Sequence, residues 1–305
     1  MSHPRLHILS LLLLLPACVE HDGGLDGAGG ASAVLSANAA VNAPDAPAAP
    51  TSDAQVARTY VNPATETHGV CLPGMVEVKG SYCTGLMHRC VKGGRSYVGK
   101  PDTAPMPYFC DEYQPGYARC LGREQPKHFC MDDLEYPNQP GEIPRVMVTW
   151  TEAKQLCETQ GKRLCGDDEW TLACEGPERR PFTYGWSRDA TACNIDRPWI
   201  KPDDGILAQR EGEKVDAEVA RLSQRVPSGS MPACVSPYGV HDMGGNVDEW
   251  TVNVTLAGKP YKSMFKGGHW AKGARNRCRP TTESHDESTF YYAEGFRCCA
   301  DPKTP

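Results

Sequence analysis

The clearest periodic pattern of apolar positions predicts an α-helix from Thr149 to about Gln160. Three apolar residues in this stretch recur at the spacing that places them on one helical face, Ala153, Leu156 and Cys157. Thr149 can cap the first turn, and Glu152 stands three residues later, as a capping box requires. Gly161 should then end the helix, because glycine readily adopts the left-handed conformation after a last turn.

The rest of the domain has weaker patterns. A second helical turn is predicted from Gly166 through Cys174, with Trp170 and Leu172 pointing inward. Residues 212–225 (Glu213 to Arg225) are rich in charge and predict a short exposed helix. Short apolar runs between Gly and Pro turns predict short strands and long loops. The expected fold class is therefore α+β, irregular and disulfide-rich, with little regular secondary structure, and not a layered sandwich.

The first 18 residues have the pattern of an export signal. Arg5 precedes an apolar run, Ile8 to Leu15, that is interrupted only by Ser10 and falls well short of the roughly 20 residues that cross a bilayer. The run ends in Leu-Pro-Ala-Cys, which resembles the bacterial lipobox. Residues 1–18 are therefore predicted to be a lipoprotein signal peptide, with Cys18 as the lipid anchor. The alternative is an ordinary signal peptide cut near Ala17, which exports the protein equally well.

The composition changes twice along the chain. Residues 19–67 are mostly Ala, Gly, Pro, Asp and Asn, and such a segment buries too little apolar surface to offset the entropy of ordering. We predict a disordered tether here. From residue 68 onward Cys, Trp and Tyr become frequent. Residues 68–130 are predicted to form a Cys-rich N-terminal part, and residues 131–305 the core of the domain.

The charge balance limits the partners. The formal net charge is -6, from 32 basic and 38 acidic residues, which argues against binding to nucleic acid. A short basic cluster, Arg275, Arg277 and Arg279, is interpreted as a set of structural ion pairs and not as a binding patch.

The cysteine count predicts a crosslinked domain. Of the 15 cysteines, Cys18 would carry the lipid, and the other fourteen form an even set in an exported protein, where disulfides persist. Up to seven bridges follow, although spacing alone leaves their connectivity open. A zinc site is the competing interpretation, and the absence of a CxxC repeat or an HExxH motif argues against it.

Four segments, taken in order, carry a family resemblance. They are Gly74-Met75-Val76-Glu77-Val78; Val148-Thr149-Trp150 with Gly161-Lys162-Arg163-Leu164 and Glu169-Trp170; residues 236–250, which include Gly245-Asn246-Val247-Asp248-Glu249-Trp250; and Lys266-Gly267-Gly268-His269-Trp270 with Gly295-Phe296-Arg297-Cys298. Together they resemble the sulfatase-modifying-factor domain of formylglycine-generating enzymes, over about residues 74–301. The resemblance implies an elaborated C-type-lectin-like fold.

One departure from the family pattern concerns catalysis. The family's enzymes oxidise a substrate cysteine to formylglycine with Cu(I) and O₂, and two cysteines five positions apart hold the copper soon after a Gly-Gly-x-aromatic turn. In this chain the turn at residues 267–270 is followed by seven residues without cysteine. Cys278 comes next and matches a structural cysteine of the family. Because soft Cu(I) requires thiolate ligands, copper is not expected here.

The resemblance also implies two disulfides, Cys157–Cys298 and Cys174–Cys278. Each would close a loop of more than 100 residues, which stabilises by roughly 4–5 kcal/mol on the chain-entropy model. Cys299 is an added neighbour of Cys298, and Cys165 is a candidate partner for it. The alternative is that one cysteine of this adjacent pair is reactive.

A calcium site is the second property that the resemblance implies. Its ligands would be the side chains of Asp242 and Glu249 and the main-chain carbonyls of Gly245 and Val247. A second site would use Asn194 and the carbonyl of Ile195, with further ligands left open among nearby aspartates. Hard oxygen ligands on a glycine-containing turn suit Ca²⁺, which would be structural. The alternative is an acidic turn beside a buried Trp250. His241 and His269, also in family motifs, are interpreted as hydrogen-bonded wall residues.

The leading functional hypothesis is an exported lipoprotein whose domain is non-catalytic and serves as a binding or structural module at the cell envelope. Its partners would be a polypeptide or glycan of the envelope, and the membrane through the lipid. Val19 is not the acidic residue that signals inner-membrane retention, which favours the outer membrane. One alternative is an oxidase with a non-standard site at Cys278 with Cys298 or Cys299. Another, by fold analogy alone, is calcium-dependent glycan binding.

Overall fold

The structure, a computed structural model, describes residues 69–93, 110–271 and 275–303. All of them belong to the unit Ala57–Pro305. The predicted signal peptide, the lipid-anchor residue Cys18 and the predicted tether at residues 19–67 lie outside the described residues. Within the described ranges, no helix is both long and apolar enough to span a bilayer.

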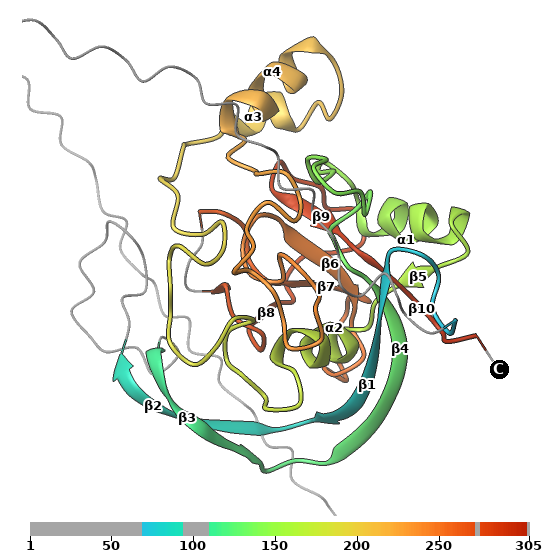
Figure 1. The fold of residues 1–305 in the computed structure, drawn as a ribbon. Coiled ribbons are helices and arrows are strands. Elements are labelled where there is room, and N and C mark those ends of the chain that lie inside the picture. Colours follow the sequence, from blue (N-terminus) through green and yellow to red (C-terminus); the bar gives the residue numbers. More distant parts are fainter. Residues whose placement is uncertain (1–68, 94–109, 272–274, 304–305) are drawn as a thin grey trace, which may run out of the picture. The chain divides into compact units, whose positions relative to one another are not determined.

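A long antiparallel ribbon forms the N-terminal part of the domain (Figure 1). Strand β1 (Met75–Cys83) pairs along its whole length with β4 (Glu124–Asp132), and β2 (Leu86–Gly93) pairs with β3 (Cys110–Cys120). These strands are longer than the short strands predicted from the sequence. Most of the β2 side chains are exposed, so the strand lacks the alternation of buried and exposed residues on which such a prediction depends.

Two further sheets complete the domain. One has the order β1-β4-β10-β5, with β5 at Arg163–Leu164 and β10 at Cys298–Ala300. The other has the order β8-β7-β6-β9, and its strands are β6 (Asp248–Val252), β7 (Ser263–Lys266), β8 (Thr281–Thr282) and β9 (Glu294–Phe296). Strands β6 and β9 are parallel, and the other named pairs are antiparallel. Only Arg297 separates β9 from β10, so the chain steps from one sheet to the other at this residue.

The predicted helices are confirmed. Helix α1 (Trp150–Thr159) begins at the predicted cap Thr149, and both hydrogen bonds of the capping box with Glu152 are present. Helix α2 (Asp167–Glu175) buries Trp170 and Leu172, as predicted.

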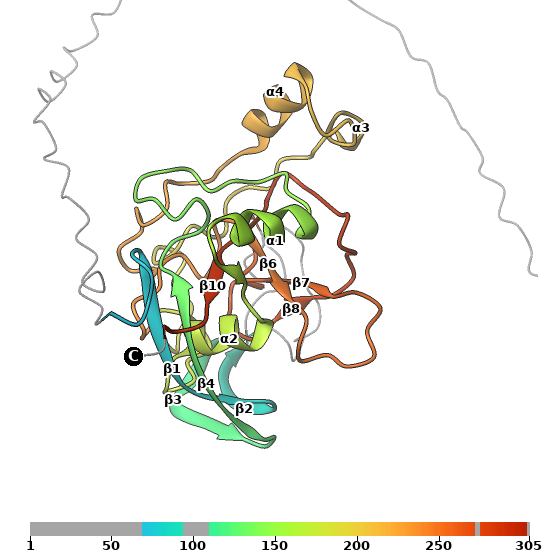
Figure 2. The same cartoon turned by 90° about the vertical axis from the view of Figure 1, so that its right-hand side faces the viewer.

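Helix α4 (Glu213–Leu222) matches the predicted charged helix. One of its faces is nevertheless buried, through Val215 and Leu222. With α3 (Asp204–Leu207) it projects from the body of the domain in both ribbon views (Figures 1 and 2).

Strand β10 separates two hydrophobic clusters. Cys299 belongs to the cluster around Trp170, whereas its neighbour Cys298 belongs to the cluster around Trp250. Successive side chains of a strand point to opposite faces, so these adjacent cysteines reach different partners. Cys298 bonds to Cys157 on α1.

All fourteen cysteines of the described residues are paired in disulfides. The seven bridges are Cys71–Cys130, Cys83–Cys120, Cys90–Cys110, Cys157–Cys298, Cys165–Cys299, Cys174–Cys278 and Cys193–Cys234. They include the two pairs that the family resemblance implies. The predicted class, an irregular α+β domain held by disulfides, is confirmed.

Candidate functional site

The loop at residues 242–249 leads into β6 and carries the predicted calcium ligands. Three of its residues have positive φ angles, 57° at Asp242, 85° at Gly245 and 56° at Asn246, so the backbone curls tightly. The side chains of Asp242 and Glu249 are both buried. The loop therefore brings two acidic side chains into the interior of the domain.

Glu249 is held in a buried ion pair with Arg297. The two guanidinium nitrogens Nε and Nη2 donate to the two carboxylate oxygens at 2.7 Å each. Trp170 Nε1 also donates to Glu249 Oε2, at 2.8 Å. Arg297 Nη1 reaches the carbonyl oxygens of Asp133 and Asp132 at 3.0 and 3.3 Å. The Glu-Trp and Phe-Arg-Cys motifs, which are far apart in the sequence, are thus in direct contact, together with α2.

A third buried carboxylate, Glu135, lies at this site and was not identified from the sequence. It accepts hydrogen bonds from the Asn246 amide at 2.7 Å, the Val247 main-chain N–H at 3.2 Å and the Ser228 hydroxyl at 3.0 Å. It follows β4 by three residues and approaches the loop from a segment more than 100 positions away. The acidic run Asp132-Asp133-Leu134-Glu135 was the only available signal, and it carries no recognisable motif.

The electrostatics of this site disfavour the ionisation of two of its carboxyl groups. Burial, and then repulsion by Asp242 and Glu249, raises the pKa of Glu135 well above its ordinary value. Burial also raises the pKa of Asp242 to about 6, against the opposing effects of a hydrogen bond from Gly229 N and of the Arg297 charge. The three carboxyl groups thus disfavour one another's ionisation, and the charge of Arg297 offsets part of this effect.

The chemistry of these donors fits a hard divalent cation. Each carboxylate oxygen offers more than one lone pair, so the contacts with Arg297 leave acceptor capacity on Glu249. Together, Asp242, Glu249 and the carbonyls of Gly245 and Val247 would hold Ca²⁺, with Glu135 beside them. Only two of these four ligands are acidic side chains. Across the described segments, no group of three or more His, Cys, Asp or Glu side chains could hold a metal ion.

The second predicted calcium site is organised differently. Asn194 Oδ1 accepts a hydrogen bond from Arg197 Nε at 2.8 Å, and Asn194 Nδ2 donates to Asn246 Oδ1 at 3.0 Å. The carbonyl of Asn194 accepts the Asn246 N–H at 2.9 Å. Asn194 and the adjacent Ile195 therefore support the loop 242–249. The amide oxygen of Asn194 thus contacts a guanidinium, as the carboxylate of Glu249 does.

The nearby aspartates, among which the further ligands were left open, each have a partner. Asp196 pairs with Arg188 at 2.6 Å, and Asp203 caps α3 through Ile206 N at 3.1 Å. Asp204 accepts a hydrogen bond from the Tyr291 hydroxyl at 2.8 Å. Each of these side chains thus has a structural role at its own position.

Both histidines of the family motifs contact neighbouring groups. His241 Nδ1 lies 2.8 Å from Asp133 Oδ1, a carboxylate 108 positions away, so the sequence spacing gave no sign of this partner. The His269 ring packs edge-on against Trp270, with centroids 5.2 Å apart, and its Nδ1 accepts the Ala271 N–H at 3.3 Å.

The turn at residues 267–270, where the family's copper cysteines would follow, is held by polar contacts. Asp248 Oδ1 accepts the Gly268 N–H at 3.1 Å, and the same carboxylate pairs with Arg275. Asn276 Nδ2 donates to the carbonyl oxygens of Gly267 and His269 at 3.1 and 3.3 Å. Residues 272–274 lie outside the described residues.

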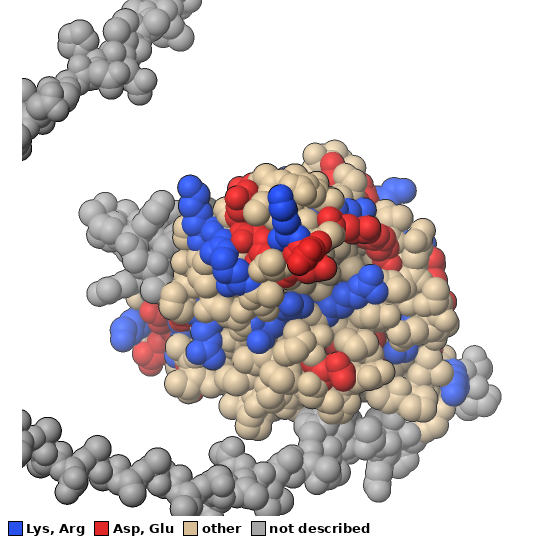
Figure 3. Space-filling model, turned by 90° about the horizontal axis from the view of Figure 1, so that it is seen from above, with Lys and Arg blue, Asp and Glu red and all other residues tan. Residues whose placement is uncertain are grey.

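The basic cluster behaves largely as predicted. Arg275 pairs with Asp248, and Arg279 pairs with Glu175 at 2.6 Å, so two of the three arginines form structural ion pairs. Arg277 donates to the Tyr113 hydroxyl at 2.5 Å. On the face seen from above Figure 1, acidic and basic side chains are interspersed (Figure 3).

The three cysteines considered as catalytic candidates are buried and bonded. Cys278 is paired with Cys174, Cys298 with Cys157, and Cys299 with Cys165. A disulfide sulfur carries no thiolate with which to bind metal or attack a substrate. In this oxidised state the three cysteines act as crosslinks.

Comparison with known proteins gives a consistent set of similarities. Residues 111–302, more than half of the chain, match the family described as a sulfatase-modifying factor enzyme 1-like domain. Over 169 residues the chain is 28% identical to an inactive C-alpha-formylglycine-generating enzyme 2 of Bos taurus, with 54% of this chain and 52% of that protein covered. It is 26% identical over 176 residues to a formylglycine-generating enzyme of Mus musculus, with 52% and 44% covered.

The chain thus spans about half the length of these curated relatives, or less. Among solved structures, PvdO from Pseudomonas aeruginosa aligns with a TM-score of 0.41 and 16% identity, over 74% of this chain and 94% of that chain.

Proposed function

Because this chain belongs to the sulfatase-modifying factor enzyme 1-like family, we propose that it is a non-catalytic member that serves as a binding or structural module at the cell envelope. The observation that carries the proposal is the absence of cysteine between Trp270 and Cys278, where the family's enzymes hold copper. The pairing of all fourteen described cysteines supports it. The similarity to a relative described as inactive is a further support.

The competing hypothesis is an oxidase that uses Cys278 with Cys298 or Cys299, and it requires free thiols. The test is thiol labelling of the unfolded, unreduced chain, followed by peptide mass mapping and Cu(I) titration of the native protein. We expect no labelled cysteine in the domain and no stoichiometric Cu(I) binding, while the reduced protein labels fully as a control. Two free thiols among these three positions that bind Cu(I) would refute the non-catalytic proposal.

We also propose that the loop 242–249 holds a structural Ca²⁺, and the burial of Glu135, Asp242 and Glu249 at one place supports this. Adding Ca²⁺ on the order of 1 mM, the range of extracellular calcium modules, should raise the melting temperature of the EDTA-treated protein. Asp242→Asn removes one charged ligand at nearly constant volume and should abolish the increase. Asp216→Asn on α4 is the matched control and should retain it. An unchanged melting temperature in the wild type would contradict calcium binding.

Export and anchoring remain part of the proposal. Seven disulfides support an oxidising compartment outside the cytoplasm. Cys18→Ser should release the protein from the membrane fraction, whereas Ser10→Ala, within the apolar run, should not. Recovery of both variants with membranes would contradict the lipid anchor.

The envelope partner is proposed to be a polypeptide or glycan. Glycan-array binding that EDTA abolishes would favour the calcium-dependent glycan alternative. Binding that is unaffected by EDTA would count against that alternative.

A further inference from the structure

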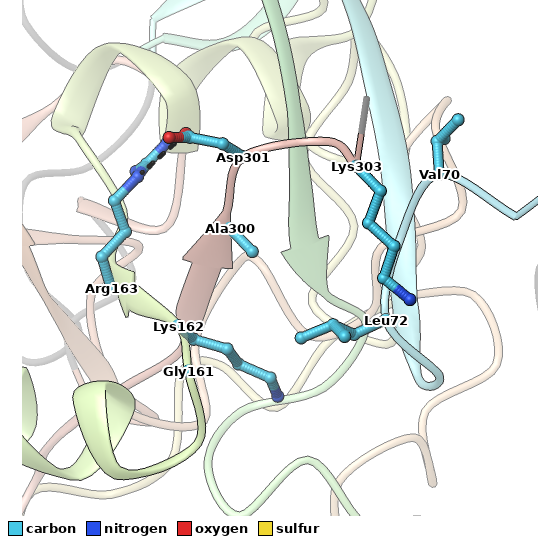
Figure 4. A pocket seen from close by; sticks show the side chains of 8 residues that line it. All are labelled: Val70, Leu72, Gly161, Lys162, Arg163, Ala300, Asp301 and Lys303. Atoms are coloured by element: carbon cyan, nitrogen blue, oxygen red, sulfur yellow. Dashed lines mark hydrogen bonds and ion pairs between the residues drawn. The ribbon is translucent and has the colours of Figure 1, made fainter. Parts of the chain in front are cut away.

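A cavity of about 430 Å³ lies where the beginning and the end of the domain meet (Figure 4). Three segments line it: Val70 and Leu72 before β1, residues 161–163 at the turn between α1 and β5, and Ala300, Asp301 and Lys303 after β10. Its volume falls within the range of small-molecule sites in proteins. None of the predicted calcium or copper residues lines it.

The cavity has an apolar floor between charged walls. In Figure 4 the side chains of Leu72 and Ala300 point into the cavity, and those of Lys162 and Lys303 extend along its sides. Val70 adds a further apolar contact surface. A ligand that fills the cavity must therefore place an apolar part on this floor.

Two of the three cations in the walls are already neutralised. Lys162 Nζ pairs with the buried Asp132 at 2.7 Å. Arg163 forms two 2.7 Å hydrogen bonds with Glu169 and pairs with Asp301 at 2.9 Å. These pairs fix the positions of the walls and leave little charge for a ligand.

Lys303 supplies the remaining positive charge. Its side chain is exposed, and among the carboxylates in the described ranges none forms an ion pair with it. A single ammonium group beside an apolar floor complements a ligand with one negative charge. The second negative charge of a dianion would be repelled by the carboxylate of Asp301, which lines the same cavity.

The walls are held in place without a ligand. The Lys303 N–H donates to the Val70 carbonyl at 2.8 Å, and Ala300 pairs with Cys130 on β4. Cys130 is itself bonded to Cys71, between the two apolar residues of the first segment. Because backbone pairing and a crosslink build the cavity, little ordering entropy would be lost on binding.

We propose that this cavity binds an aliphatic monocarboxylate, with the carboxylate at Lys303 and the hydrocarbon on Leu72 and Ala300. The same chemistry can come from a free short-chain acid or from the C-terminal carboxylate of a peptide that ends in an apolar residue. The site shares no residue with the loop 242–249 or with the turn at 267–270. It therefore stands independently of the proposed function.

The test is calorimetric or NMR titration of the full chain with three probes: hexanoate, N-acetyl-Ala-Leu and the C-terminal amide of that dipeptide. We expect carboxylate probes to bind at least about tenfold more tightly than the amide, because a charge-assisted hydrogen bond to an ammonium is lost with the amide. Tighter binding of hexanoate identifies a free acid as the source, and tighter binding of N-acetyl-Ala-Leu identifies a peptide terminus. Equal binding of dipeptide and amide, or no binding of any probe at millimolar concentration, would overturn the proposal.

Two variants locate the site. Lys303→Gln should weaken the binding of the better carboxylate by about tenfold, while Lys214→Gln on the exposed face of α4 should leave it unchanged. Ala300→Leu should weaken binding by filling the floor of the cavity. Acetate serves as the probe for one negative charge without a hydrocarbon chain, and binding as tight as that of hexanoate would refute a role for the apolar floor.

Discussion

At the residue scale, Lys266 is an unusual component of the core. It is a charged side chain on β7 that is only 1% exposed. Its ammonium donates to the Arg279 carbonyl at 3.1 Å and lies over the Trp170 ring, 5.3 Å from the centroid. Burial lowers its pKa to about 7, and the charges of Asp167 and Glu175 oppose this effect. The folded protein therefore holds this proton less tightly than the unfolded chain does.

This difference predicts a pH-dependent stability. Between pH 7 and the ordinary lysine pKa of 10.5, the unfolded chain binds a proton at this position that the folded state does not. The free energy of unfolding should therefore rise with pH across this window, by at most about 1.4 kcal/mol per pH unit from this group. Below the pKa of the folded state, Lys266 is protonated in both states, and the folded protein bears the full cost of burying its charge. Urea unfolding at pH 7 and pH 9 measures the effect.

The variant Lys266→Met tests the assignment. It retains most of the side-chain volume and removes the titrating group, so its stability should rise less between pH 7 and pH 9 than that of the wild type. Lys214→Met, at an exposed position of α4, is the control and should follow the wild type. If Lys266→Met and the wild type show the same pH dependence, another group is responsible.

At the element scale, short-range signals predicted the helices better than the strands. The cap at Thr149 and the stop at Gly161 are local features, and α1 forms between them. Strand β2 carries mostly exposed side chains and β3 mostly half-buried or exposed ones, and the disulfide Cys90–Cys110 links the two strands. An alternating sequence pattern predicts a strand that has one buried face. It therefore cannot identify the strands of a ribbon that is held by disulfides and backbone pairing.

The loop 242–249 depends on one close backbone approach. A Cβ atom at Gly245 would lie 2.3 Å from the carbonyl oxygen of Asn194, and the φ angle of +85° already disfavours any other residue. Gly258 has nearly the same φ, +83°, but a Cβ there would have no heavy atom within 4 Å. Both glycines therefore have a positive φ angle, but only Gly245 is packed against a neighbouring atom.

Paired substitutions separate these two effects. Gly258→Ala should cost about 1–2 kcal/mol, the strain of a left-handed residue. Gly245→Ala should cost about 1–3 kcal/mol more, because the Asn194 carbonyl must move. Denaturant unfolding of both variants measures the difference. Equal losses of unfolding free energy in the two variants would indicate that the Asn194 carbonyl can move aside at no cost.

At the scale of the whole molecule, Arg297 and β10 connect the parts. Arg297 lies at the step between two sheets and is fully paired with Glu249 on β6. The next two residues carry disulfides to opposite sides, Cys298 to α1 and Cys299 to Cys165 beside β5. Three consecutive residues thus join the two sheets and the two hydrophobic clusters.

The crosslinks should differ in their contribution to stability. The Cys157–Cys298 bridge has a sequence separation of 141 residues, and Cys90–Cys110 has one of 20. On the chain-entropy model, removing them by double alanine substitution should cost about 5 and about 3 kcal/mol, respectively. Thermal or urea unfolding under non-reducing conditions provides the comparison. A larger loss for the Cys90–Cys110 variant would show that loop length does not govern these contributions.

The sequence by itself determined the local features: the capped helix α1, helices α2 and α4, an even set of domain cysteines and the motifs that identify the family. These depend on residues that are near one another in the chain or that match the family position by position. The family resemblance also implied two pairs of distant cysteines, Cys157–Cys298 and Cys174–Cys278, and the structure contains both. Which other distant groups meet was decided by the tertiary structure. Glu135 joins the loop 242–249, and Asp133 lies beside His241, because β4 delivers both to this site across more than 100 positions.

The cavity beside Lys303 has the same origin, since its walls come from the two ends of the domain. No local pattern records a contact that chain folding creates between distant segments. Burial, charge repulsion and cavity shape depend on such contacts, so they could be established only from the folded structure.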